Sequence, residues 1–154
     1  MKEPIVKPTT RGDIPALQAV LDQTGLFPGD MLPDMAAPAL TGQSPALWLT
    51  CHLGGAPVGL SYTVPEAFAD GTWNMLALAV RPDLQCRGLG SALVAAAEQH
   101  LRAGNQRLLI VDTSGTAAFA RARQFYARQG YKEAARIRDF WAAGDDKVTF
   151  RKAL

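Results

Sequence analysis

A glycine-containing stretch between an apolar run and a helix-forming run constrains this 154-residue chain more than any other feature. Residues 75–80 (MLALAV) are apolar throughout, residues 85–90 (QCRGLG) carry two glycines, and residues 91–97 (SALVAAA) favour a helix. This order predicts a strand, a loop and a helix. Glycines let a ligand approach the backbone closely, and a helix that begins there offers N–H groups and the positive end of its dipole. Such a loop suits a phosphate group.

The spacing of the two glycines decides which phosphate site is possible. A dinucleotide site needs G-x-G-x-x-G with an acidic residue about 20 positions later, and a Walker loop needs Gly-Lys followed by Ser or Thr. Neither pattern is present, because the stretch from Gln85 to Gly90 reads Q-x-x-G-x-G. A tight turn into a helix uses the same glycines without binding anything. The six residues alone therefore leave the ligand open.

Length and composition predict one soluble domain over residues 1–154. Hydrophobic residues make up 48% of the chain and the formal net charge is +2, which gives no reason to expect a nucleic-acid or membrane partner. The first residues lack the apolar segment of a signal peptide, and no apolar run approaches a membrane span, so we expect a cytoplasmic protein. Cys51 and Cys86 are expected to be reduced, and neither has the neighbours of a metal site.

The first 45 residues predict a strand, a helix and an irregular segment. Alternation over Ile5–Thr9 predicts a short strand, and Asp13 followed by Pro15 predicts the capped start of a helix. Four prolines and three glycines between residues 24 and 45 permit at most a short broken helix around Met31–Ala39. This apolar segment either lines a pocket or packs as a surface loop, and the sequence leaves both open.

Hydrophobic periodicity predicts the remaining elements. Alternating runs on either side of a Gly-Gly pair predict a hairpin of strands 47–53 and 58–64, and residues 72–81 predict a central strand apolar on both faces. After the glycine loop we expect a helix that ends at Gly104, a parallel strand over 107–112, a helix over 116–129, and strands over 131–140 and 147–151.

A second motif adds specificity to the glycine loop. Residues Phe125 to Tyr131 read F-Y-A-R-Q-G-Y, and they begin about 36 residues after the loop. With the loop and the order of elements, this motif resembles the GCN5-related N-acetyltransferase (GNAT) family, whose members close their cofactor site with F-Y-x-x-x-G-F/Y. The resemblance covers the chain from about Ile5 to its end, and its specific part lies between Asn74 and Tyr131.

The resemblance implies an α+β fold with three α/β layers, in which helices cover both faces of a mixed, mostly antiparallel sheet of six to seven strands. It also implies acetyl-CoA as cosubstrate. In the family, the pantetheine arm pairs with the central strand, here at Leu78, Ala79 and Val80. Backbone N–H groups of the loop hold the pyrophosphate, here matching Cys86, Arg87, Gly88, Gly90 and Ser91, and Gln85 opens this cofactor-binding motif.

The resemblance implies candidate catalytic residues as well. Tyr126 matches the tyrosine that assists departure of the CoA thiol, since a phenol of pKa about 10 stabilises a thiolate through a hydrogen bond. A core tyrosine beside Phe125 is the alternative. Some members carry a glutamate where this chain has Asn74, which is no base but can hold a water that relays the proton. Glu66, in the turn before that strand, is the other candidate, so the general base is left open.

Several positions depart from the family pattern or extend it. Many members have Asn seven residues before the tyrosine, where this chain has Phe119, and this puts one cofactor contact in doubt. Arg121 and Arg123 either reach CoA phosphates or are solvated, and we favour solvation. Asp139 or Asp145 either pairs with a cationic acceptor or belongs to a turn.

The implied function is transfer of an acetyl group from acetyl-CoA to a primary amine of a small molecule or peptide by direct attack. The tail from Arg138 to Lys147 resembles that of bacterial-type members, in which the last hairpin borders the acceptor pocket. No metal is implied, and a homodimer, common in such folds, is left open. The alternative is a non-catalytic acyl-CoA-binding sensor or interaction module with the same fold.

Overall fold

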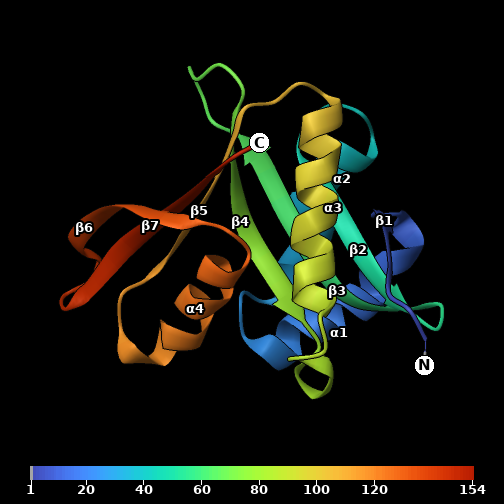
Figure 1. Ribbon diagram of the computed structural model, residues 1–154. Helices are drawn as coiled ribbons and strands as arrows, with labels where there is room; N and C mark the ends of the chain where they lie inside the picture. The colour runs from blue at the N-terminus through green and yellow to red at the C-terminus, as the bar shows by residue number, and fades with distance from the viewer. Residues whose placement is uncertain (1) are drawn as a thin grey trace. The chain divides into compact units, whose positions relative to one another are not determined.

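The computed structural model describes residues 2–154, whose seven strands form one mixed sheet in the order β1-β2-β3-β4-β5-β7-β6 (Figure 1). The strands are β1 (Ile5–Pro8), β2 (Leu47–Leu53), β3 (Ala56–Pro65), β4 (Thr72–Val80), β5 (Leu108–Ser114), β6 (Lys132–Ala142) and β7 (Asp145–Ala153). The helices are α1 (Ile14–Thr24), α2 (Leu32–Leu40), α3 (Leu89–Ala103) and α4 (Ala120–Arg128). β4 and β5 are parallel, whereas β1–β2, β2–β3, β5–β7 and β6–β7 are antiparallel. The predicted α+β fold with a mostly antiparallel sheet is confirmed.

The chain divides into two compact units that share β4. The first unit comprises the N-terminal segment through Val64 together with Leu76–His100, and the second comprises Pro65–Met75 and Leu101–Leu154. The sequence predicts one domain over residues 1–154, and the division into two compact units leaves this a prediction.

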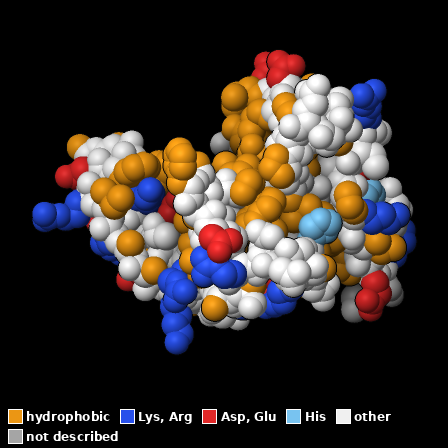
Figure 2. All heavy atoms as spheres, turned by 90° about the horizontal axis from the view of Figure 1, so that it is seen from above, with side chains coloured by type: hydrophobic (Ala, Val, Ile, Leu, Met, Phe, Trp, Pro, Cys, Tyr) orange, Lys and Arg blue, Asp and Glu red, His pale blue; other side chains and the backbone are white. Residues whose placement is uncertain are grey.

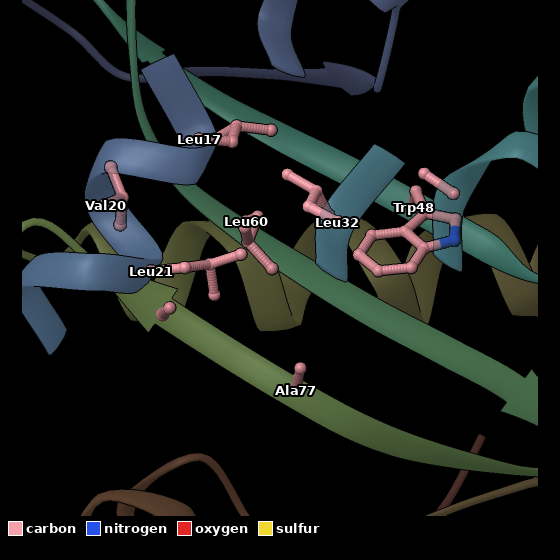
Figure 3. Packing of buried hydrophobic residues seen from close by; sticks show 9 residues of the cluster. Leu17, Val20, Leu21, Leu32, Trp48, Leu60 and Ala77 are labelled. Atoms are coloured by element: carbon pink, nitrogen blue, oxygen red, sulfur yellow. The ribbon is translucent and has the colours of Figure 1, made fainter. Parts of the chain in front are cut away.

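In the first unit, α3 lies on one face of the strands, and α1 and α2 lie on the other (Figure 1). The 3.6-residue period of α1 points its apolar positions toward the strands. Figure 3 shows this packing, in which side chains of both helices meet those of β2, β3 and β4. The labelled residues are Leu17, Val20, Leu21, Leu32, Trp48, Leu60 and Ala77, and none of them is more than 6% exposed. Since burying one large apolar side chain stabilises by about 1.5–3 kcal/mol, this cluster anchors both helices.

The opposite face is shaped by Gly59 of β3. A Cβ atom at this position would lie 2.9 Å from the carbonyl oxygen of Ala79 and 3.3 Å from Cδ1 of Leu93 in α3. Glycine therefore lets β3, β4 and α3 approach one another closely. This contact fixes the start of α3 beside the end of β4, where the glycine loop lies.

The segment between residues 24 and 45 is more regular than predicted. α2 is a continuous helix of nine residues although Pro38 lies inside it. Pro38 removes one backbone hydrogen bond, but Leu32 and Ala36 are fully buried in the core of the first unit. Packing thus outweighs the unfavourable local sequence on the inner face of α2, whereas Leu26 and Met31 remain about half exposed. Four residues of the segment, Pro33, Ala37, Leu40 and Thr41, also line a cavity.

The first helix also begins differently from the prediction. A 3-10 turn over Arg11–Asp13 precedes α1, and the carboxylate of Asp13 accepts a hydrogen bond from the backbone N–H of Thr10 at 3.0 Å. Asp13 thus occupies the N-cap position of α1, with Pro15 in the first turn as predicted, but its carboxylate binds the preceding turn and makes no capping bond to α1. Similarly, the helix expected over 116–129 divides into a 3-10 turn at Ala117–Phe119 and α4.

Two expectations about strands are corrected. β6 and β7 extend farther than predicted, since Ala142 pairs with Asp145, which shortens the connection expected at 142–146. β4 carries apolar residues on both faces as predicted, but it is not fully covered, because Leu76 is 53% exposed.

In the second unit, α4 packs against β7 through the rings of Tyr126 and Phe150, whose centroids are 6.1 Å apart. In the β5–β7 pair, Val111 lies opposite Phe150, and Asp112 lies opposite Thr149. Because successive side chains of a strand point to opposite faces, Asp112 and Thr149 lie on the face away from α4.

The surface mixes apolar and charged side chains, as the face in Figure 2 shows. Within residues 2–154, no helix combines the length and apolar character needed to cross a membrane.

Candidate functional site

The glycine loop leads from β4 into α3 and has an unusual backbone. Cys86 and Gly88 both adopt left-handed conformations, with φ of 63° and 83°, and Arg87 lies between them. Alternation of right- and left-handed residues turns successive N–H groups toward one side and forms an anion-binding concavity. The space around a Cβ at Gly88 is open, so the backbone conformation, not crowding, favours glycine there.

The start of α3 adds to this anion-binding geometry. The carbonyl of Gly88 accepts the N–H of Ala92 at 3.0 Å, so the N–H groups of Leu89 and Gly90 precede the first i→i−4 hydrogen bond. They lie at the positive end of the dipole of a 15-residue helix. Loop and helix together therefore suit a phosphate-bearing ligand.

Side chains next to the loop hold it in place. Nε2 of Gln85 donates to the carbonyl oxygen of Val80 at 3.1 Å and so ties the loop to the end of β4. Arg81 binds the carboxylate of Asp83 through two hydrogen bonds of 2.7 and 3.2 Å. The hydrogen bond from Arg81 lowers the pKa of Asp83, whose negative charge is thus paired beside the loop.

The three residues matched to the pantetheine arm end β4. Leu78 is half-buried, and Ala79 and Val80 are buried. The parallel pairing of β4 with β5 covers Thr72–Asn74, whereas residues 78–80 lie farther along the strand.

Tyr126 lies on α4 in the second unit, within an aromatic cluster. Its ring is 5.2 Å from that of Phe125, 6.0 Å from that of Tyr131 and 6.1 Å from that of Phe150, measured between centroids. The residue is 8% exposed, and burial raises the pKa of its phenol to about 12. Among residues 2–154 the hydroxyl has no hydrogen-bond partner. At neutral pH the Tyr126 phenol is therefore uncharged and able to donate a hydrogen bond. The ring can pack in the aromatic cluster while the hydroxyl takes part in chemistry.

The structure brings Asn74 and Glu66 together, although the sequence presented them as alternatives. Nδ2 of Asn74 donates to Oε1 of Glu66 at 2.9 Å and to Oδ2 of Asp112 at 3.3 Å. Asn74 is 6% exposed, and its buried Oδ1 has no hydrogen-bond donor among the described residues. Glu66 is half-buried and held by an amide, so it is not the solvated turn residue that its position suggested.

Asp112 is a member of this group that the sequence reasoning missed. Oδ1 of Asp112 accepts a hydrogen bond from Oγ1 of Thr149 at 2.5 Å, and Nζ of Lys147 lies 4.0 Å from Oδ2. One signal was available, because a carboxylate directly follows the apolar run 108–111 in the strand parallel to β4.

Three other charged residues have roles within the fold. One guanidinium nitrogen of Arg123 donates to two backbone carbonyls at 2.7 Å each, so this side chain is not simply solvated as expected. Asp139 accepts the N–H of Gly144 at 2.7 Å, and Asp145 accepts the hydroxyl of Ser114 at 2.5 Å. The turn interpretation of the last hairpin is therefore the one with direct support.

A cavity of about 380 Å³ in the first unit contains none of the predicted site residues. It lies at α1 and α2, and its lining residues are Arg11, Ile14, Pro15, Pro33, Ala37, Leu40 and Thr41.

Comparison with known proteins identifies a family. The family described as "Acetyltransferase (GNAT) domain" matches residues 45–133, which is more than half of the chain. No curated protein matches the sequence. A structure from Desulfovibrio desulfuricans that is assigned to the GNAT family shares 27% identity at a TM-score of 0.87, over 98% of this chain and 99% of that one.

Two further solved structures share the fold at lower identity. The ribosomal-protein-S18-alanine N-acetyltransferase from Escherichia coli has a TM-score of 0.79 and 18% identity, over 98% of this chain and 94% of that one. An aminoglycoside 6'-N-acetyltransferase complexed with coenzyme A has a TM-score of 0.78 and 16% identity, over 97% and 96% of the two chains.

Proposed function

This chain belongs to the GNAT family of acetyltransferases, and we propose that it transfers an acetyl group from acetyl-CoA to a primary amine of a small molecule or peptide. Acetyl-CoA is the cosubstrate of the family. The observation that carries the proposal is the loop from Gln85 to Ser91, which lies inside the matched segment and has an anion-binding backbone.

We assign binding of the cosubstrate to the first unit. Two phosphate groups require several donors at once, which a turned backbone and a helix start supply together. The proposed pyrophosphate contacts are Cys86, Arg87, Gly88, Gly90 and Ser91, with Gln85 opening the motif, and the proposed pantetheine contacts are Leu78, Ala79 and Val80. Gln85 acts here by fixing Val80, because its side-chain amide is already bound to that carbonyl.

We assign proton removal from the amine to Glu66. An ammonium group has no lone pair, so the amine nitrogen must lose a proton before or during its attack on the thioester carbonyl. The carboxylate of Glu66 accepts that proton, and Asn74 holds this carboxylate through the hydrogen bond of 2.9 Å. The C–N bond forms first, with the carbonyl electron pair moving onto oxygen, and the C–S bond breaks when this oxyanion collapses.

We assign stabilisation of the departing thiol to Tyr126. A thiolate leaves from the thioester, and the neutral phenol donates a hydrogen bond or its proton to the sulfur. The pKa of about 12 keeps the phenol protonated at every pH at which the enzyme would work. Backbone N–H groups near Val80 stabilise the oxyanion that forms on the carbonyl oxygen.

The test is a thiol-release assay with acetyl-CoA and a panel of amines. The fold neighbours are named for a ribosomal-protein alanine and for an aminoglycoside, so the panel includes a peptide with N-terminal alanine, an aminoglycoside, a polyamine and lysine. Amine-dependent release of thiol is expected with at least one class. Binding of acetyl-CoA without turnover on any amine would instead favour the sensor or interaction module.

Calorimetry with acetyl-CoA, ATP and NAD tests a third possibility, that the chain is a general nucleotide-binding protein. Such a protein would bind ATP or NAD about as well as acetyl-CoA, whereas the proposed site should bind acetyl-CoA more tightly.

A further inference from the structure

We propose that Asp112 is a positioning residue for this reaction, which acts through Asn74 to hold the carboxylate of Glu66 in place. The inference rests on the function proposed above. It concerns a side chain that the family motifs do not include and that reaches the site from another strand.

The geometry forms one continuous chain of hydrogen bonds in the second unit. The hydroxyl of Thr149 donates to Asp112, and the single amide nitrogen of Asn74 donates to both Asp112 and Glu66. The amide has two N–H groups, and each is directed to one carboxylate. Asp112 thereby determines where the second N–H, the one toward Glu66, points.

The unpaired oxygen of Asn74 supports the inference that the carboxylates orient the amide. Oδ1 is buried and finds no donor within residues 2–154, and leaving a buried acceptor unpaired is unfavourable. Turning the amide over would place Oδ1 against the carboxylates of Glu66 and Asp112, and this repulsion between acceptors is less favourable than one unpaired oxygen. The carboxylates therefore set the orientation of the amide at the expense of Oδ1.

Asp112 is itself held from the opposite side. Thr149 lies directly across from it in the β5–β7 pair and fixes Oδ1, while Lys147 lies 4.0 Å from Oδ2. Nζ of Lys147 also lies 4.1 Å from the ring centroid of Phe140. The ammonium of Lys147 therefore offsets part of the negative charge of Asp112.

Asp112→Asn tests the role directly. The new side chain keeps its shape, and it keeps both bonds only if its amide nitrogen donates to the Thr149 hydroxyl while its oxygen accepts from Asn74. The oxygen that faces Asn74 is then neutral, so the bond that holds the Asn74 amide loses its charge assistance and weakens. We expect kcat to fall about tenfold to a hundredfold, because misplacing a reacting group by about 1 Å has effects of that size. The Kd of acetyl-CoA should stay unchanged.

The double variant with Asn74→Ala separates positioning from a general structural effect. If Asp112 acts through Asn74, Asp112→Asn changes kcat less than about twofold in the Asn74→Ala background, since interacting residues are not additive. Equal losses in both backgrounds would overturn the inference.

Two variants of Thr149 test the inference without changing Asp112, so the test remains possible if Asp112→Asn does not fold. Thr149→Val removes the hydroxyl at nearly constant shape, and Thr149→Ser retains it. We expect Thr149→Val to lower kcat about three- to tenfold, the effect of one lost hydrogen bond, and Thr149→Ser to match the wild type. Identical kcat values for the two variants would contradict the inference.

These outcomes distinguish the inference from the function on which it rests. A wild type that binds acetyl-CoA and acetylates no amine overturns both. An active wild type with additive variants overturns the role of Asp112 alone.

Discussion

The glycine loop and the Glu66–Asn74–Asp112 group are built in opposite ways. The loop depends on backbone groups of neighbouring residues, and its hydrogen bonds join positions four or five apart, such as Gly88 with Ala92 and Gln85 with Val80. The polar group depends on side chains, and it joins Asn74 to Asp112 across 38 positions. A backbone site tolerates most side chains except at its glycines, whereas a side-chain site depends on every member.

This difference predicts two separable effects of substitution. Changes in the loop should alter the affinity for acetyl-CoA and leave kcat nearly constant at saturation. Changes in the polar group should alter kcat and leave that affinity constant.

The largest effect is expected for Glu66→Gln. The amide keeps an oxygen that can accept from Asn74, but it cannot take a proton, so kcat should fall about 10²–10⁴-fold, the usual contribution of a general base. Steady-state kinetics and calorimetry measure kcat and the Kd of acetyl-CoA in parallel. A kcat within twofold of the wild type would remove Glu66 from the chemistry.

The next effect is expected for Tyr126→Phe. Loss of the donor should lower kcat about tenfold to a hundredfold, at or below the lower end of the range of about 10²–10⁴-fold for acid–base groups. The aromatic contacts remain, and the hydroxyl has no partner within residues 2–154, so the melting temperature should barely change. An unchanged kcat in a folded variant would leave Tyr126 only its packing role.

Tyr126 also predicts a pH dependence of stability. Its folded-state pKa of about 12 exceeds the ordinary value of 10.0, so the unfolded chain loses this proton first. The stabilisation is fully present below pH 10 and disappears as pH rises toward 12, by up to about 2–3 kcal/mol. Denaturant unfolding between these pH values should show a smaller loss for Tyr126→Phe than for the wild type. Parallel curves would contradict the raised pKa.

A smaller effect is expected for Gly88→Ala. The φ of 83° costs a residue with a Cβ about 1–2 kcal/mol, so the loop should relax and the Kd of acetyl-CoA rise about tenfold. Gly42→Ala is the matched control, because Gly42 has a φ of 77°, an equally open surrounding and a position outside the loop. The control should lose similar stability at unchanged affinity. Equal affinities for the two variants would show that the loop does not bind the cosubstrate.

The smallest effect is expected for Gln85→Ala. It removes one hydrogen bond, to the carbonyl of Val80, and should raise the Kd of acetyl-CoA about fivefold, or about 1 kcal/mol. A change in kcat at unchanged Kd would contradict the assignment of affinity to the glycine loop and of kcat to the Glu66–Asn74–Asp112 group.

The contrast between local backbone contacts and distant side-chain contacts also explains which features could be predicted from the sequence. The glycine loop was predictable because contiguous residues determine its backbone, and the order of strands followed from hydrophobic periodicity. α2 was underestimated because burial of Leu32 and Ala36 outweighs Pro38, and local propensity does not include tertiary packing.

The polar group was only partly predictable. Asn74 and Glu66 were recognised singly, but their contact depends on how the turn after β3 returns to β4. Asp112 comes from β5, and only the parallel pairing of β4 with β5 brings it within reach of Asn74. Arg123 resembled a solvated residue for the same reason, since its partners are backbone carbonyls that the sequence does not display.

The most direct test of the account is mass spectrometry of the amine panel after incubation with acetyl-CoA and the wild-type protein, with release of free thiol measured in the same samples. The account predicts that one amine class gains a single acetyl group in equal amount to the thiol released. Tight binding of acetyl-CoA with no acetylated amine and no thiol in any sample would contradict it.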